Sequence, residues 1–284
     1  MLTTIATHAA HPDGVEDDLL LASALRAAGA DVRFAVWNDP TVDWSLGDVT
    51  VIRSTWDYHL DPTAWFAWLD HVTRRTRLVN PAGLVRWNSD KTYLFDLLSR
   101  GVAVIPTVLL TGRVDTRALC AEHGWDDVVI KPTVGANSDG ARRFRGDAIG
   151  GEGVAHAAAL LSSGKALLQP YQSAVEDQRE RSLVYIDGEF RYAFTKAAFN
   201  GSEGEQSKPR HHATPDERAL AAAVLAALPI QPTFARIDLL PSPRGPLMME
   251  AELVEPQLVL EHDAGAVDRF AKALLRAATA RPPQ

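Results

Sequence analysis

The chain of 284 residues has a single cysteine, Cys120, and lacks any apolar run of membrane-spanning length. One cysteine excludes a disulfide framework and a cysteine-based metal cluster, so we expect Cys120 to be a partly buried apolar residue. The N-terminus, MLTTIATHAAHPDG, has neither a basic leader nor a sustained apolar core and is therefore unlike a secretory signal peptide. These absences predict a cytoplasmic protein with no membrane partner.

Basic residues are outnumbered, because 29 Lys and Arg face 36 Asp and Glu and give a formal net charge of −7. This balance argues against nucleic acid as a partner, although it leaves room for a locally basic site. A dinucleotide fingerprint is missing as well. The first predicted strand is followed by HAAHPDG and not by G-x-G-x-x-G, which disfavours an NAD-binding dehydrogenase. His8 and His11 in that turn are too few and too loosely spaced for a zinc site.

The first eighty residues alternate short apolar runs with a helical pattern. Strands are predicted at 2–7, 31–37 and 49–53, and a helix at 16–28. This alternation predicts a parallel sheet covered by helices, whose ligands bind beyond the carboxyl ends of the strands. The segment RSTWDYH, which begins at Arg53, lies at such an end.

The middle of the chain places two lysines next to predicted elements. Lys91 opens a helix, and Lys131 ends a strand just before the small, polar loop 133–140. Further on, LLQPYQ ends another strand, and Glu176 follows Gln169 by seven residues. Taken singly, each feature is weak, because a lysine at a strand end is usually structural or solvated and Gly/Ser loops are usually turns.

Residues 234–256 predict a β-hairpin, since two apolar runs flank a Pro/Gly-rich turn. Asp238 stands in the first arm, and Glu250 and Glu252 stand two apart in the second, so that both point to one face. Three carboxylates on one face repel each other unless a cation lies among them, and Mg²⁺ prefers such oxygen ligands. By itself, the pattern fits a solvated acidic strand face equally well.

In this order, the two lysines, the glycine-rich loop, the LLQPYQ strand end and the Asp…Glu-x-Glu hairpin resemble the ATP-grasp superfamily. The resemblance spans most of the chain and implies an α/β and α+β architecture, in which a Rossmann-like N-terminal domain precedes the ATP-grasp fold. The implied units are this preceding domain, a connecting helix with the small lobe, and a large lobe with the metal site. They correspond to residues 1–80, 81–170 and 171–284.

The resemblance also implies how ATP is bound. The two lysines would contact the phosphates, and the loop would close over them. Backbone groups of the LLQPYQ strand end, at the hinge between the lobes, would bind adenine, and a glutamate would accept hydrogen bonds from the ribose hydroxyls. The implied ATP-binding residues are Lys91, Lys131, Ser138, Gly140, Gln169, Pro170, Tyr171 and Glu176.

A second implied group binds metal and assists catalysis. Asp238, Glu250 and Glu252 match the ligands of Mg²⁺, with two ions expected and Mn²⁺ as an alternative. Arg236 and Lys196 match catalytic residues that face the phosphate or the bound carboxylate. One departure stands out, because the superfamily commonly has Asn at the position of Glu252, and this leaves the metal occupancy open.

Three phrases, RSTWDYH, NSDKTYL and MEAELVEPQL, resemble a narrower branch, that of the O-ureidoserine cyclo-ligase of D-cycloserine (antibiotic) biosynthesis. The implied activity is an ATP-dependent carboxylate–amine ligase that forms a C–N bond through an acyl phosphate. Its substrate would be a small amino-acid-like molecule, with intramolecular cyclisation as one form. A small-molecule kinase and a non-catalytic nucleotide-binding module are the alternatives, and a homo-oligomer is left open.

For the substrate itself, we predict a carboxylate clamp at Arg53 and an ammonium contact at Asp57. Arg210, in the polar loop 200–213, is a third candidate. The alternatives are that Arg53 and Asp57 pair with each other and that Arg210 is solvated.

Overall fold

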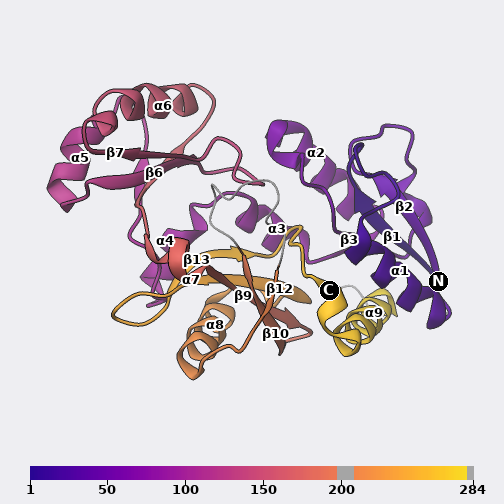
Figure 1. Cartoon of the computed structure of the whole chain (residues 1–284). Helices are drawn as coiled ribbons and strands as arrows, with labels where there is room; N and C mark the ends of the chain where they lie inside the picture. Colours follow the sequence, from indigo (N-terminus) through magenta and orange to yellow (C-terminus); the bar gives the residue numbers. More distant parts are fainter. Residues whose placement is uncertain (197–207, 280–284) are drawn as a thin grey trace.

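The computed structural model describes residues 1–196 and 208–279, and the strands in these ranges form three sheets (Figure 1). The N-terminal sheet is parallel and has the order β2-β1-β3-β4. This arrangement confirms the predicted βαβ alternation. Its elements are β1 (Leu2–Thr7), α1 (Glu16–Ala27), β2 (Asp31–Val36), β3 (Val49–Ile52), α2 (Pro62–Thr73) and β4 (Arg77–Val79).

The second sheet forms the small lobe, residues 108–170, which we call the lid and which stands apart from the other two sheets in Figure 1. It is antiparallel, with the order β5-β8-β6-β7. Buried side chains of Val128, Ile130 and Leu168 pack with Cys120 and Ala157 of two helices. The elements are β5 (Val108–Leu110), α5 (Thr116–His123), β6 (Asp127–Pro132), β7 (Arg142–Arg145), α6 (Glu152–Leu161) and β8 (Ala166–Pro170).

The third sheet is the centre of the molecule and is buried on both faces. Its order is β11-β10-β9-β12-β13, all antiparallel. On β9, Leu183 and Tyr185 point into one core and Val184 and Ile186 into another, as the two-residue period of a strand requires. The strands are β9 (Glu180–Ile186), β10 (Glu189–Lys196), β11 (Arg210–His211), β12 (Phe234–Leu240) and β13 (Leu247–Glu252).

Helices from distant parts of the chain cover these two faces. One core contains side chains of α3 (Ala82–Ser89), α4 (Tyr93–Ser99) and α8 (Pro215–Ala227). The other contains Phe270 and Leu274 of α9 (Ala264–Thr279) together with Leu21 and Leu25 of α1. The remaining short helices are η1 (Trp44–Leu46), η2 (Tyr58–Leu60), η3 (Gly146–Ile149), α7 (Ala174–Gln178) and η4 (Leu260–His262).

Each predicted unit contains one of the sheets, but two segments pack with another unit. The helices α3 and α4, which we grouped with the lid, cover the central sheet, because their apolar faces bury against β9 and β12. The helix α9 packs against α1, β3 and β4 of the N-terminal domain. The predicted polar loop 200–213 lies outside the described residues except for 208–213, which include β11. No helix in the described ranges is both long and apolar enough to cross a membrane.

Candidate active site

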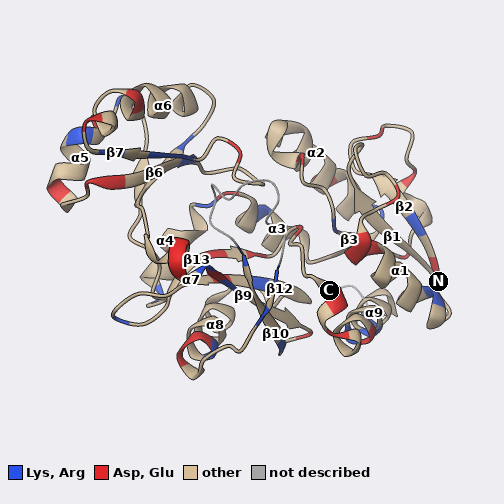
Figure 2. Ribbon diagram, viewed as in Figure 1, with Lys and Arg blue, Asp and Glu red and all other residues tan. Residues whose placement is uncertain are grey.

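A cavity of about 490 Å³ is lined by residues of the lid, the central sheet and the segment after β3. A volume of this size is typical of small-molecule sites. One part of its wall is apolar and includes Ile105, Val129, Leu240 and Met249. The rest is crowded with charge, and Figure 2 shows basic and acidic positions side by side on the strands of the central sheet.

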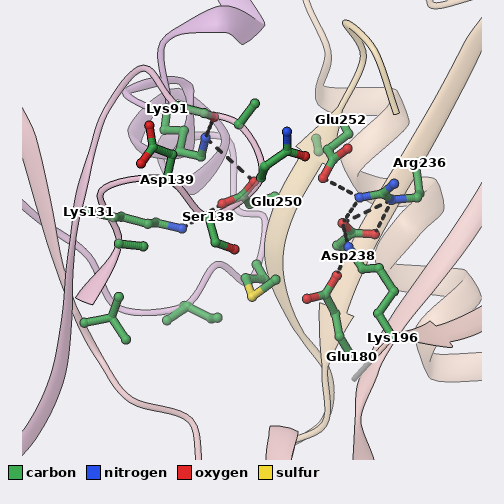
Figure 3. Close-up of a pocket in the computed structure, with 18 of the residues that line it drawn as sticks. Lys91, Lys131, Ser138, Asp139, Glu180, Lys196, Arg236, Asp238, Glu250 and Glu252 are labelled. Atoms are coloured by element: carbon green, nitrogen blue, oxygen red, sulfur yellow. Dashed lines mark hydrogen bonds and ion pairs between the residues drawn. The ribbon is translucent and has the colours of Figure 1, made fainter. Parts of the chain in front are cut away.

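Glu250 of β13 lies between the two predicted phosphate lysines (Figure 3). Lys131 Nζ donates to its Oε1 at 2.7 Å, and Lys91 Nζ lies 3.9 Å from its Oε2. Burial by itself would raise the pKa of Glu250, but the charges of Lys131 and Lys91 outweigh burial and hold this pKa at about 2. Lys91 also donates from Nζ to the carbonyl of Gly135 at 2.6 Å, which ties it to the glycine-rich loop.

Asp238 of β12 is fully buried and has three hydrogen-bonding partners. Arg236 Nη2 donates to it at 2.9 Å, Lys196 Nζ at 2.8 Å and Ser182 Oγ at 2.8 Å. The register explains the grouping, because Asp238 pairs with Ser182 on one neighbouring strand and with Glu250 on the other. Burial opposes ionisation, but Arg236 and Lys196 keep the pKa of Asp238 well below its usual range.

Two further carboxylates show the opposite shift. Glu252 contacts Arg236, and Glu180 contacts Lys196. Burial raises the pKa of Glu180 to about 8, although Lys196 opposes the shift. Burial also raises the pKa of Glu252, against the effect of Arg236. We did not predict Glu180. The signal for it is its position two residues before Ser182 in a strand, which places both on one face.

The three predicted metal ligands lie in one cavity, but each is paired with a basic side chain. Across the described ranges, no three His, Cys, Asp or Glu groups form a ready-made metal site. The donor set nevertheless fits Mg²⁺, because all three offer carboxylate oxygens. Metal binding would therefore exchange ion pairs for metal contacts.

The predicted adenine-binding segment lines the cavity at the end of β8. Gln169 Nε2 donates to Thr107 Oγ1 at 2.8 Å, and the N–H of Tyr171 donates to the carbonyl of Asp127 at 2.8 Å. Pro170 lines the cavity between them. The three residues therefore border the cavity from the lid side.

In the glycine-rich loop, Ser138 lines the cavity and Gly140 does not. Ser138 has a φ of 59° and Gly140 one of 70°, so the loop turns through the left-handed region that glycine tolerates best. His156 Nε2 lies 2.9 Å from the carbonyl of Gly140 and anchors the end of the loop to α6.

Glu176 does not line the cavity, and its contact with the ribose stays a prediction. It lies half-exposed on α7 and accepts from Arg143 Nη1 at 2.8 Å and from Tyr171 Oη at 2.9 Å. Arg143 in turn binds both carboxylate oxygens of Asp127 and stacks on the Tyr171 ring. These contacts hold the Glu176 carboxylate at the outer edge of the lid.

Arg53 is also outside the cavity, and its role as a substrate clamp stays a prediction. Its side chain is 2% exposed, with Nε 3.3 Å from Asp18 and Nη2 3.6 Å from Asp17. Asp57 does not pair with it either, but accepts from Trp37 Nε1 at 2.7 Å. Both predicted contacts are therefore already engaged in holding the N-terminal domain together.

Arg210 is exposed on β11 and does not line the cavity. Lys208, two residues earlier, does line it and donates from Nζ to Gln257 Oε1 at 2.7 Å. Trp56 also lines the cavity and donates from Nε1 to the carbonyl of Glu255 at 3.1 Å. We had predicted neither Lys208 nor Glu255, since no local pattern marks either residue.

Known proteins match both this chain and its fold. A family model described as the N-terminal domain of D-cycloserine synthetase DcsG matches residues 3–80. The cycloserine biosynthesis protein DcsG of Streptomyces lavendulae is 35% identical over 273 residues, which cover 89% of this chain and 91% of that protein. The chain belongs to the DcsG family.

Solved structures extend this family assignment to the fold. The crystal structure of D-cycloserine synthetase DcsG covers 98% of this chain and 100% of its own, with a TM-score of 0.89 and 32% identity. A D-alanine–D-alanine ligase from Bacillus anthracis matches 98% of this chain and 97% of its own, with a TM-score of 0.66 and 15% identity, and so shares the fold. The predicted ATP-grasp ligase fold is therefore confirmed for this member of the DcsG family.

Proposed function

We propose that the chain is an ATP-dependent ligase that joins a carboxylate to an amine through an acyl phosphate. The γ-phosphoryl group of ATP passes to the carboxylate, the amine attacks the acyl carbon, and phosphate leaves as the C–N bond forms. One observation carries the proposal. In a chain of the DcsG family, a single cavity brings Lys91 and Lys131 to the acidic hairpin of the large lobe.

Residues of the lid, together with Lys91 just before α4, bind ATP in this proposal. Lys91 and Lys131 exchange their contacts with Glu250 for contacts with the phosphates, and Ser138 closes over them. Adenine lies against the apolar wall beside Gln169, Pro170 and Tyr171. The glycine-rich loop then excludes water, which an acyl phosphate requires because water would otherwise hydrolyse it.

Asp238, Glu250 and Glu252 hold Mg²⁺, with two ions as the expected number and Mn²⁺ as the alternative. Ions held there would supply positive charge against the transferring phosphoryl group. Arg236 and Lys196 act beside them by donating to oxygens that gain negative charge during the transfer. Both donors contact Asp238 in the structure, and metal binding at Asp238 would free them to donate to these oxygens.

The substrate in this proposal is a small, amino-acid-like molecule, and O-ureidoserine is the compound to test first. The basis is the similarity to the cycloserine biosynthesis protein, together with a cavity of a size typical of small-molecule sites. The predicted cytoplasmic location agrees with an enzyme that consumes ATP and stays a prediction.

The deciding experiment measures ADP release by the purified protein with O-ureidoserine and a panel of amino acids, and identifies the products by mass spectrometry. A new C–N bond with free phosphate supports the ligase. A phosphate retained in the final product identifies a kinase instead, and a lack of ADP release with every compound indicates a nucleotide-binding module.

A further inference from the structure

One cation in the cavity differs from all the others in its partner. Lys91, Lys131, Lys196 and Arg236 each lie within 4 Å of a carboxylate. Lys208 also lines the cavity, but across residues 1–196 and 208–279 its side chain contacts a neutral group, the Gln257 amide oxygen at 2.7 Å. The cavity therefore contains a positive charge without an anionic partner in the described chain.

This charge is partly shielded from water, so that its attraction to an anionic partner is stronger than at the surface. Lys208 is half-buried, and burial together with the charge of Arg236 lowers its pKa. An ammonium group has three N–H donors, and Gln257 uses one of them. Two donors on Lys208 are left to bind a further acceptor.

Gln257 brings Lys208 next to a second basic residue. Its side-chain oxygen accepts from Lys208, and its backbone carbonyl accepts from Arg236 Nη1 at 2.8 Å. The other donors of Arg236, on Nε and Nη2, go to Asp238 and Glu252. One N–H on Nη1 is then left over, since each Nη carries two. Lys208 and Arg236 thus offer three donors beside the same residue.

We propose that Lys208, together with the remaining Nη1 donor of Arg236, binds the carboxylate of the substrate. A carboxylate has enough lone pairs to accept all three bonds, and charge-assisted bonds of this kind are among the strongest in proteins. The inference rests on the proposed ligase function and names the residue that anchors its carboxylate substrate. It assigns the carboxylate to a different basic residue from Arg53, which the sequence predicted for this role.

Two substitutions of the same residue separate an anion-binding role from a purely structural one. Lys208→Arg keeps the charge, whereas Lys208→Gln keeps a hydrogen-bonding group next to Gln257 and removes the charge. If Lys208 only tethers Gln257, the Gln variant works as well as the Arg variant. If it binds the carboxylate, the Arg variant keeps most of the affinity and the Gln variant loses it.

The first test is steady-state kinetics with O-ureidoserine and ATP. For Lys208→Gln we expect the apparent KM for O-ureidoserine to rise by about tenfold or more, the usual effect of losing a hydrogen bond between charged groups. The apparent KM for ATP should stay within about twofold, because the substrate contact is separate from the nucleotide lysines. Lys272→Ala, a change on the exposed face of α9, is the matched control. An unchanged KM for O-ureidoserine, or an equal rise for ATP, overturns the inference.

The second test does not depend on turnover and uses the wild-type protein. Lysines are acetylated with acetic anhydride and quantified by mass spectrometry, alone, with ATP, or with O-ureidoserine. O-ureidoserine should protect Lys208 and leave Lys272 reactive, whereas ATP should protect Lys91 and Lys131. Protection of Lys208 without ADP release would retain the binding role and refute the ligase. Normal ADP release without protection of Lys208 would support the ligase and refute the binding role of Lys208.

Discussion

Two neighbouring regions of the molecule contain buried ionic groups of the same kinds but use them differently. The first is the junction between the N-terminal domain and the large lobe. There, Arg53 lies between Asp17 and Asp18. The carboxylate of Asp17 also accepts from three successive backbone N–H groups, those of residues 258–260, at 2.6–3.0 Å. All of these contacts are made between residues of the protein itself and serve to hold its parts together.

The second region is the cavity, where Arg236 and Asp238 are as deeply buried as Arg53. Their partners lie at the edge of an open volume, so that an incoming ligand can replace one contact by another. Burial and ion pairing are therefore shared by both regions. What distinguishes the functional region is that its charged groups border a space large enough for a ligand.

The strongest test of this comparison is Lys131→Ala in the cavity. We expect ADP release to fall by about 10³-fold, because a preorganised phosphate contact is lost. The thermal midpoint should fall less than in Arg53→Ala, because Lys91 still lies 3.9 Å from Glu250. Lys165→Ala, which removes an exposed lysine of the lid, serves as control. Near-normal turnover by the Lys131 variant would show that the phosphate site is misassigned.

Arg53→Ala should do the opposite and act on stability. Removal of one partner of a buried ionic group leaves Asp17 and Asp18 uncompensated, and we expect a loss of about 3–5 kcal/mol in the free energy of unfolding. Urea denaturation measures this loss, and Lys at position 53 should restore part of it. A normal unfolding midpoint combined with a raised KM for the carboxylate substrate would return Arg53 to the role that we predicted from the sequence.

Glu252→Asn sharpens the comparison within the cavity, because it restores the Glu-x-Asn pair common in the superfamily. Asn keeps one oxygen donor but removes a negative charge. We expect turnover to persist, with the half-saturating Mg²⁺ concentration raised by about tenfold. A titration of ADP release against Mg²⁺ measures the shift. An unchanged Mg²⁺ dependence would remove Glu252 from the metal site.

The smallest effect is expected outside both regions, at Asp127 of the lid. Its hydrogen bonds from Arg143 lower its pKa against the smaller effect of burial. A carboxyl group with a lowered folded pKa stabilises the protein above its unfolded pKa of about 3.9 and loses that effect as pH falls through the folded value. Asp127→Asn should therefore cost about 1 kcal/mol at pH 7. Thermal unfolding should show a smaller difference in stability between the wild type and Asp127→Asn at pH 3 than at pH 7. A difference in stability that does not depend on pH would contradict the lowered pKa of Asp127.

Much of the fold could be predicted because its signals are local. The alternation of strands with helices in the first eighty residues and the hairpin at Asp238 depend only on periodicity and turn residues. The prediction was weaker for helices that cover a distant sheet. Amphipathic patterns in 82–99 and 264–279 show that these helices bury one face, but not which sheet they bury it against.

The candidate site divides in the same way. Lys131, Asp238 and Glu250 could be placed because a strand end or a two-residue spacing determines where they point. Arg53, Glu176 and Lys208 could not, because their roles depend on partners elsewhere in the chain. Asp18 lies 35 residues from Arg53, and Gln257 lies 49 residues from Lys208.

The sequence by itself therefore determined the order of the elements, the face on which each strand residue lies, and the set of charged residues available to an ATP-grasp site. Only the tertiary structure decided which of these charges meet each other and which meet the cavity. The physical reason is that attraction between charges increases steeply at short distance and low dielectric. Packing thus decides that Arg53 meets Asp17 and Asp18 and that Lys208 is left facing the cavity.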